Sequence, residues 1–157
     1  MKAINIPGFG NLEIKRIILD LNGTIAIDGK LISGVKSRIK KLKKIGCEVF
    51  LFTGDTHGNS AVLAKKLGIK VKIAKNSKEK ASKAAKLNSR KCVTIGNGKI
   101  DHKLFKAVAL SVLVIQKEGA NTKALMNSDV ITTSICYALD LFIYEKRLIA
   151  TLRDWDF

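Results

Sequence analysis

Short apolar runs alternate with segments of helical periodicity along most of this chain, and that alternation strongly constrains its fold. The apolar runs lie at 14–19, 47–52, 69–74, 92–95, 111–115 and 130–132. Between them, apolar residues recur at helical spacing, and Gly46 and Gly68 stand where the first two helical segments should stop. Strand–helix units of this length predict a mainly parallel sheet with helices on both faces. We therefore expect an α/β fold, a three-layer αβα sandwich with a Rossmann-like sheet.

The length of 157 residues fits one domain. We expect a single domain over 1–157, with its core at about 14–144 and a tail at 145–157. No run reaches the ~20 apolar residues of a membrane span. The three cysteines fall in apolar runs without a C-x-x-C pair, which is typical of buried, reduced thiols. These features predict a cytoplasmic protein that makes no membrane contact.

The chain is strongly basic, with 29 Lys and Arg against 13 Asp and Glu, for a formal charge of +16. Ten lysines lie within 65–91, where Glu79 is the only acid. Two interpretations stay open. The lysines form a solvated surface, or they form a docking surface for nucleic acid or another anionic macromolecule. Only five of the 29 basic residues are Arg, the residue best suited to phosphate and base recognition, and this favours the solvated surface.

Polar segments follow three of the predicted strands. They are Asp20-Leu21-Asn22-Gly23-Thr24, Thr53-Gly54-Asp55 and Gly96-Asn97-Gly98-Lys99-Ile100-Asp101. Sites in open α/β sheets form at the carboxyl ends of the strands, so these segments should converge if their strands are neighbours. Each segment alone is also an ordinary turn sequence. Their occurrence together at strand ends predicts one shared site.

The residue types in these segments suit a phosphoryl group and a hard cation. Asp20 can act as a carboxylate nucleophile that forms an aspartyl-phosphate. The Thr53 hydroxyl and nearby backbone amides could hold phosphate oxygens. Oxygen ligands for Mg2+ could come from Asp20, the Asn22 carbonyl, the Asn97 side chain and Asp101. A further cation should come from the lysines of 75–86.

These segments resemble the motifs of the haloacid dehalogenase superfamily over about 14–144. The first motif, Asp-x-Asp-Gly-Thr, reads Asp20-Leu21-Asn22-Gly23-Thr24 here. The second is a Thr or Ser after a strand, the third a Lys ahead of the fourth strand, and the fourth an acidic loop at 96–101. Thr53-Gly54-Asp55 and the helical segment after it look most like the phosphorylation domain of P-type ATPases. Since no membrane span is present, the chain resembles the soluble P-type ATPase-like proteins.

The resemblance implies a Mg2+-dependent phosphohydrolase, phosphatase-like or ATPase-like, with Asp20 as its nucleophile. It further implies catalytic roles for Asn22 and Thr53, phosphate binding by Thr53 and Gly54, and metal binding by Asn22 through its backbone. The metal set implied in this way is Asp20, Asn22, Asn97 and Asp101.

The lysine of the third motif is the least determined member of the set. Lys78 is our choice for a catalytic and phosphate-binding residue, because of its distance along the chain from Asn97. Lys75 and Lys80 remain alternatives.

Two departures from the family pattern bear on the rate. Asn22 replaces an Asp that serves as general acid and base in many family phosphatases, and an amide cannot take that role. Asn97 replaces the first acid of the fourth motif, which should weaken Mg2+ binding. We expect slow turnover or a long-lived phosphoenzyme. His57 could relay a proton, although a surface histidine is the simpler interpretation. The alternative function is a catalytically weak module that binds phosphate, nucleotide or nucleic acid.

There is no room in the sequence for a cap domain. Residues 25–34 suffice only for a small β-hairpin flap, with Asp28-Gly29 as its turn. A capless site is open to large phosphorylated substrates or is closed by another subunit. A homo-oligomer is therefore one expectation for the assembly.

Overall fold

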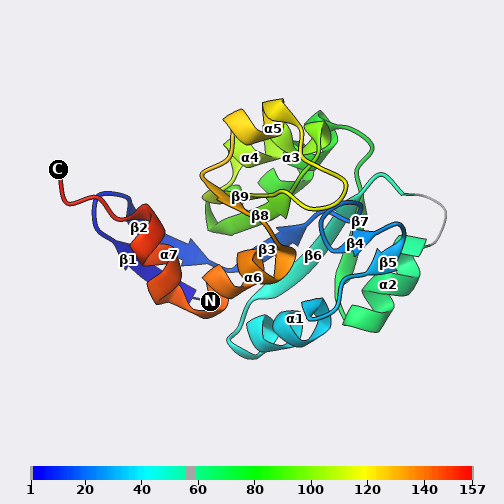
Figure 1. The fold of residues 1–157 in the computed structure, drawn as a ribbon, viewed down its shortest axis with the longest axis horizontal. Coiled ribbons are helices and arrows are strands. Elements are labelled where there is room, and N and C mark those ends of the chain that lie inside the picture. The colour runs from blue at the N-terminus through cyan, green and yellow to red at the C-terminus, as the bar shows by residue number, and fades with distance from the viewer. Residues whose placement is uncertain (1, 56–58, 157) are drawn as a thin grey trace.

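The computed structural model describes residues 2–55 and 59–156, and its centre is a six-stranded parallel sheet (Figure 1). The strands lie in the order β10-β9-β8-β3-β6-β7. Their bounds are β3 Arg16–Leu19, β6 Glu48–Thr53, β7 Lys70–Ile73, β8 Cys92–Gly96, β9 Leu110–Val114 and β10 Val130–Thr132. The alternation of apolar runs and helical segments in the sequence correctly predicted this α/β architecture.

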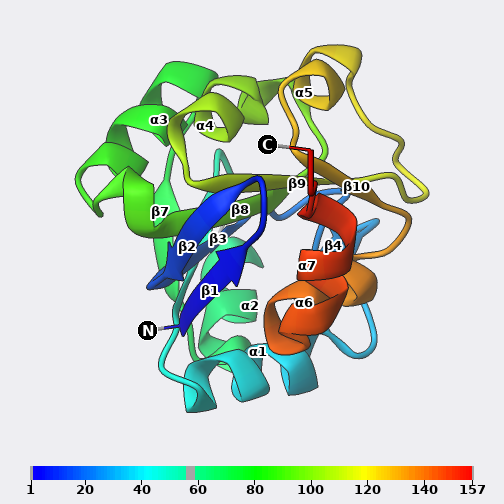
Figure 2. The same cartoon turned by 90° about the vertical axis from the view of Figure 1, so that its left-hand side faces the viewer.

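Helices cover both faces of the sheet, as Figures 1 and 2 show, and complete the three layers. On one face lie α1 Val35–Lys44, α2 Asn59–Leu67 and α6 Ile135–Ile143. On the other face lie α3 Ser77–Ala85, α4 His102–Ala107 and α5 Thr122–Met126. Single 3-10 turns, η1 Ser89–Lys91 and η2 Lys99–Asp101, precede β8 and α4.

The strand register brings the polar segments to one edge. In the central strand β3, Leu19 is paired with Leu51 of β6 on one side and with Ile95 of β8 on the other. The three strands run parallel, so the residues that follow this row emerge together. The register thus explains why segments about 30 and 80 positions apart along the chain can build one site.

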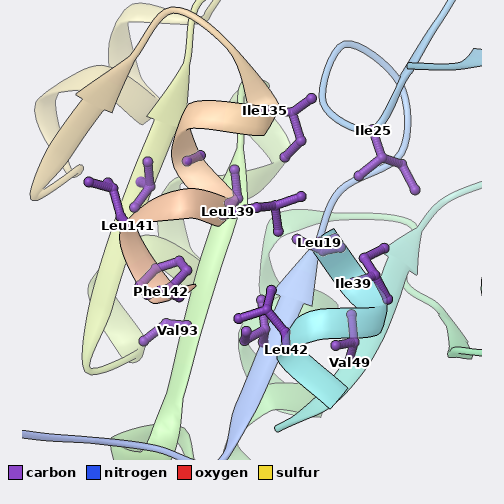
Figure 3. Packing of buried hydrophobic residues seen from close by; sticks show 14 of the residues in the cluster. Leu19, Ile25, Ile39, Leu42, Val49, Val93, Ile135, Leu139, Leu141 and Phe142 are labelled. Atoms are coloured by element: carbon purple, nitrogen blue, oxygen red, sulfur yellow. The ribbon is translucent and has the colours of Figure 1, made fainter. Parts of the chain in front are cut away.

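The largest hydrophobic cluster lies between the sheet and the layer of α1 and α6. Figure 3 shows part of it, with Leu19 and Val49 from the sheet facing Ile39 and Leu42 of α1. Leu139 and Phe142 of α6 contribute to the same cluster and are fully buried. On the opposite face, Phe50 and Phe52 pack edge to face with ring centroids 6.4 Å apart. Each face of the sheet therefore has its own apolar contact layer, as a parallel sheet requires.

A β-hairpin at the N-terminus was not predicted from the sequence. It consists of β1 Lys2–Ile6 and β2 Gly10–Ile14, and the predicted strand at 14–19 is broken at Lys15. The hairpin alternates in burial, with Ile4, Ile6, Leu12 and Ile14 buried. Lys2 donates from Nζ to the carbonyls of Phe142, at 2.9 Å, and Ile143, at 3.2 Å, at the C-terminal end of α6. The hairpin thus supplies a cation where a helix end favours one.

The tail at 145–157 is more ordered than its mixed sequence suggested. Residues Glu145–Leu152 form α7, which packs against α6 and β1 through the buried Leu148. Beyond the helix, Asp154 donates its backbone N–H to the Pro7 carbonyl at 2.9 Å. The C-terminal segment therefore lies beside the turn of the N-terminal hairpin, and both ends of the described chain lie on the side of the molecule that faces the viewer in Figure 2.

The predicted flap is present as a small hairpin of β4 Ala26–Ile27 and β5 Lys30–Leu31. Its turn residues, Asp28 and Gly29, have φ values of 51° and 75°. Positive φ at both central positions is what a two-residue type I′ hairpin requires, and Asp-Gly is a favoured pair for it. No helix among the described residues is long and apolar enough to cross a membrane.

Leu139 provides a test of the packing between α6 and the sheet. Replacing Leu139 by Ala should lower the free energy of unfolding by about 2–5 kcal/mol, because the removed atoms leave a cavity in a fully buried site. Tyr137 of the same helix is 61% exposed, so Tyr137→Ala is the matched control and should cost less than about 0.5 kcal/mol. Denaturant unfolding at constant m-value measures both, and equal losses would contradict the described packing.

Candidate active site

A cavity of about 530 Å3 lies at the carboxyl edge of the sheet, where the polar segments meet. Its lining residues are Asp20, Asn22, Thr53, Gly54, Asp55, Asn59, Asn97, Gly98 and Ile100. All three segments that the sequence singled out contribute to this wall. The prediction that they converge is therefore correct in the structure.

Lys80 of α3 connects two of these segments from behind the cavity. Its Nζ donates to Asp20 Oδ1 at 2.8 Å and to Asp101 Oδ1 at 2.7 Å. The Lys80 and Asp101 side chains are each 1% exposed, and that of Asp20 is 12% exposed. One ammonium group thus neutralises part of the charge of two carboxylates, of which Asp101 is buried and Asp20 is partly exposed in the cavity wall.

The pKa values of this group follow from burial and from the charges. Burial disfavours the Lys80 ammonium, but Asp20 and Asp101 outweigh that effect and raise the pKa of Lys80 above its ordinary 10.5. Burial and the Asp20 carboxylate raise the pKa of Asp101 to about 6, although Lys80 and the Gly98 amide act against them. Lys80 therefore remains a cation in this structure at neutral pH.

The choice of Lys78 for the third-motif lysine is not supported by these contacts. Lys78 is an exposed residue of α3, and Lys75 is an exposed residue just ahead of that helix. Lys80, which the sequence reasoning kept as an alternative, takes the position beside Asp20. The Asn76 cap explains the register: its side chain accepts the Glu79 N–H at 2.9 Å and so fixes where α3 begins. Lys80 then falls on the face that also buries Ala84.

Asp101 stands behind the cavity rather than in its wall. Its Oδ2 accepts the backbone N–H groups of Asn97, at 3.2 Å, and Gly98, at 3.0 Å, while its Oδ1 accepts from Lys80. Both carboxylate oxygens are bonded to the protein, and, unlike that of Asp20, the side chain is only 1% exposed and does not line the cavity. This geometry suits a residue that shapes the 96–98 loop and holds Lys80. It gives no support to Asp101 as a direct metal ligand.

Thr24 and Asn97 tie the first segment to the third. The Thr24 hydroxyl lies 3.4 Å from Asp20 Oδ2 and 3.2 Å from Asn97 Oδ1. Asn97 donates from Nδ2 to the Gly119 carbonyl at 3.1 Å. Between them, Gly23 has a φ of 77°, and a Cβ there would overlap the Asn97 amide. A glycine is therefore required at this point by both conformation and space.

Thr53 and Gly54 form the second wall of the cavity. The Thr53 hydroxyl accepts the backbone N–H of Asp55 at 3.1 Å, and the buried threonine thus orders the start of this loop. The Asp55 carboxylate accepts the Ser60 N–H at 3.0 Å near the beginning of α2. His57, considered as a proton relay, lies outside the described residues.

The oxygen donors around Asp20 fit a hard divalent cation that keeps part of its water. Asp20 supplies one carboxylate, and Asn22 and Asn97 supply amide and backbone oxygens in the same wall. Within 2–55 and 59–156, no three His, Cys, Asp or Glu side chains gather as a metal-binding group. Such a donor set is poor for Zn2+ but compatible with Mg2+, which normally keeps several waters.

Two contributors were missed from the sequence: Asn59, which lines the cavity at the start of α2, and Gln116. Gln116 donates from Nε2 to the carbonyls of Gly23, at 3.1 Å, and Thr24, at 3.0 Å. It lies after β9 and carries no local signature that would mark it. The role of Thr24 could have been inferred, since it stands inside the first motif.

Comparisons with known proteins bear on this geometry. A family model described as haloacid dehalogenase-like hydrolase matches residues 5–108. An uncharacterized protein of Methanocaldococcus jannaschii is 44% identical over 66 residues, which are 42% of this chain and 71% of that protein. A copper-exporting P-type ATPase of Staphylococcus aureus is 37% identical over 81 residues, which are 50% of this chain. The match spans only 10% of that ATPase.

Solved structures share the fold at low sequence identity. The 3-deoxy-D-manno-octulosonate 8-phosphate phosphatase of Moraxella catarrhalis, solved with magnesium and phosphate ions and a KDO molecule, has a TM-score of 0.66 at 21% identity. That match covers 89% of this chain and 94% of the phosphatase. A phosphoserine phosphatase in its apo form has a TM-score of 0.71 at 13% identity, over 84% of this chain and 99% of that chain.

Replacing Lys80 by Met tests the buried ion pairs. The free energy of unfolding at pH 7 should fall by about 3–5 kcal/mol, because the buried Asp101 and the partly buried Asp20 lose their cation. The raised pKa of Lys80 means that its contribution is fully present below pH 10.5 and is lost as the pH rises above that value. Lys78→Met is the matched control, with an expected change within about 0.5 kcal/mol. A larger loss from Lys78→Met than from Lys80→Met would overturn the assignment.

Proposed function

Because the chain belongs to the haloacid dehalogenase-like hydrolase family, we propose that it is a Mg2+-dependent phosphohydrolase in which Asp20 carries the phosphoryl group. The observation that supports this most directly is the position of Asp20. It lies at the end of the central strand, in a wall shared with Thr53 and Asn97, with Lys80 bonded to its carboxylate. A carboxylate nucleophile, a hydroxyl for phosphate and a fixed cation are the groups that this reaction needs.

In the first step an Asp20 carboxylate oxygen attacks the phosphorus of the substrate. The new P–O bond forms as the bond to the leaving group breaks, and the leaving group departs with the electron pair and takes a proton from water. In the second step water attacks the same phosphorus, which releases inorganic phosphate and a proton and restores the Asp20 carboxylate. Thr53 and Gly54 hold the phosphoryl oxygens in both steps, and Lys80, from behind the cavity, offsets the negative charge at Asp20.

Mg2+ would be held by Asp20, the backbone carbonyl of Asn22 and the side-chain oxygen of Asn97, with water in the remaining positions. When bound, it would supply charge neutralisation between the nucleophile and the incoming phosphate. The Asn97 oxygen already faces the Thr24 hydroxyl, so Thr24 would set its direction. With one carboxylate in the set instead of two or three, we expect weak Mg2+ affinity.

Asn22 makes the second step the slower one. It stands in the cavity wall, exposed, where it could face a leaving group or an incoming water. An amide neither donates a proton to the leaving group nor takes one from water. Leaving groups that depart without protonation should therefore be preferred, and the phosphoenzyme should persist.

The substrate class we favour is a phosphomonoester with a good leaving group or an acyl phosphate. Two of the solved neighbours are named as phosphatases of small phosphorylated molecules. Among the described residues, only the small β4–β5 flap follows the first motif, so no cap domain covers the cavity. Phosphorylated groups on larger molecules are therefore also sterically compatible.

Asp20→Asn tests the nucleophile. With Mg2+ and an aryl phosphate, the wild type should release phosphate and the variant should be slower by at least about 100-fold. Asp28→Asn in the flap turn makes the same change outside the wall and should retain activity. Binding of beryllofluoride, which mimics a phosphorylated carboxylate, should be lost in Asp20→Asn alone. Equal activity of the wild type and Asp20→Asn would refute the assignment of the nucleophile.

Asn22→Asp tests whether a missing acid and base limits the rate. Restoring a carboxylate should raise kcat by about 10²–10⁴, the usual contribution of such a group. Asn5→Asp on β1 is the control for the added charge. If the wild type binds phosphate without turnover and Asn22→Asp gains activity, the chain is the weak binding module considered above. No gain in a folded variant would contradict the explanation from Asn22.

A further inference from the structure

Gln116 holds the backbone of the first motif from outside the cavity wall. Its Nε2 donates to the carbonyls of both Gly23 and Thr24, and its Oε1 accepts the Ile135 N–H at 2.9 Å. The two N–H groups and the oxygen of this amide are therefore all bonded to backbone. In Figure 1 the segment after β9 runs beside the loop that follows β3, where these contacts form.

An amide is the side chain that this position requires. Two neighbouring carbonyl oxygens and one N–H face a single group, so the group must donate twice and accept once. A carboxylate would place oxygen lone pairs against the two carbonyl oxygens, and these negatively polarised atoms would repel each other. A hydrocarbon would leave all three backbone groups unsatisfied, which costs free energy in a partly buried place.

The same segment also braces the fourth motif. Gly119 accepts from Asn97 Nδ2, and the Asn121 N–H donates to the Asn97 carbonyl at 2.8 Å. Within the segment, the Gly119 N–H donates to the Gln116 carbonyl at 2.9 Å. Residues 116–121 therefore form one short brace, bonded at one end to the loop of Asp20 and at the other to the loop of Asn97.

We propose that Gln116 is a positioning residue for phosphoryl transfer, fixing the peptide planes at Gly23 and Thr24 and through them the Asn22 carbonyl and the Asp20 carboxylate. The effect on the Asp20 carboxylate passes through Thr24, whose hydroxyl faces it. Gln116 itself touches neither substrate nor reacting atoms. This role rests on the proposed function, because it concerns how the metal and phosphoryl sites are aligned. Small displacements of such groups cost large factors in rate.

Two variants isolate the donated bonds. Gln116→Glu retains the acceptor for Ile135 but loses both donations and adds a charge. Gln116→Met loses all three bonds and adds no charge. The common consequence is release of the Gly23 and Thr24 carbonyls. Both variants should therefore lower kcat for an aryl phosphate about tenfold or more and raise the Mg2+ concentration for half-maximal rate, with a smaller change in KM for the aryl phosphate.

A readout without metal or substrate separates this inference from the proposed function. Amide hydrogen exchange by NMR should be at least about tenfold faster at Gly23 and Thr24 in both variants, and unchanged at Ala138 in α6 of Gln116→Glu. Asn127→Asp is the matched control, since Asn127 donates from Nδ2 to the Lys123 carbonyl on α5, away from the cavity. It should change neither exchange at these sites nor the Mg2+ dependence.

Faster exchange at Gly23 and Thr24 with shifted kcat and Mg2+ dependence supports the proposal. Faster exchange in a chain whose wild type hydrolyses nothing removes the proposed function and leaves Gln116 as the residue that orders this loop. Unchanged exchange in the folded variants overturns the positioning role. So does a lower melting temperature combined with unchanged kcat and unchanged Mg2+ dependence well below that temperature, because a merely structural bond would give that result.

Discussion

Lys80 reaches from α3 to the ends of two strands, and its ammonium group stands between the carboxylates of Asp20 and Asp101. Removing Lys80 and Asp101 from water, and Asp20 in part, is costly, and this cost is offset by the short distances and by the further hydrogen bonds to Asp101. The arrangement places a fixed positive charge beside the candidate nucleophile. It also locks α3 against the sheet edge, so the helix layer and the site depend on each other.

Much of the fold could be predicted from the sequence because a parallel sheet buries whole strands. The run Cys47 to Phe52 and its following helical segment are clear for that reason, and the polar segments after β3, β6 and β8 follow from topology. The Asp28-Gly29 turn was equally clear, since few sequences accept positive φ twice. In each case a local pattern and the global fold demand the same residues.

The remainder depends on contacts between distant positions. Lys78 and Lys80 are equivalent in a lysine-rich segment until the Asn76 cap sets the helix register, and only then is one of them buried. The N-terminal hairpin is held by the buried Ile4, Ile6, Leu12 and Ile14 and by Lys2, which bonds to the end of α6, 140 residues away. Gln116 is ordinary by composition and acquires meaning only from Gly23 and Thr24. The lysines of this segment also differ in their surroundings. Lys70 Nζ lies 5.5 Å from the Phe50 ring centroid, whereas Lys80 is buried in the interior.

The contact of the first strand with the last helices has a practical consequence. The Lys2 contacts with α6 and the hydrogen bond from Asp154 to Pro7 hold both ends of the described chain on the side of the sheet where β3 starts. Asp20 and the mouth of the cavity lie at the opposite edge, where β3 ends (Figure 1). An affinity tag, a fluorescent protein or a natural neighbouring module attached at either end would therefore project away from the mouth of the cavity. Immobilisation through either terminus should leave that mouth facing solution, which suits this chain to surface-based binding measurements with bulky phosphorylated ligands.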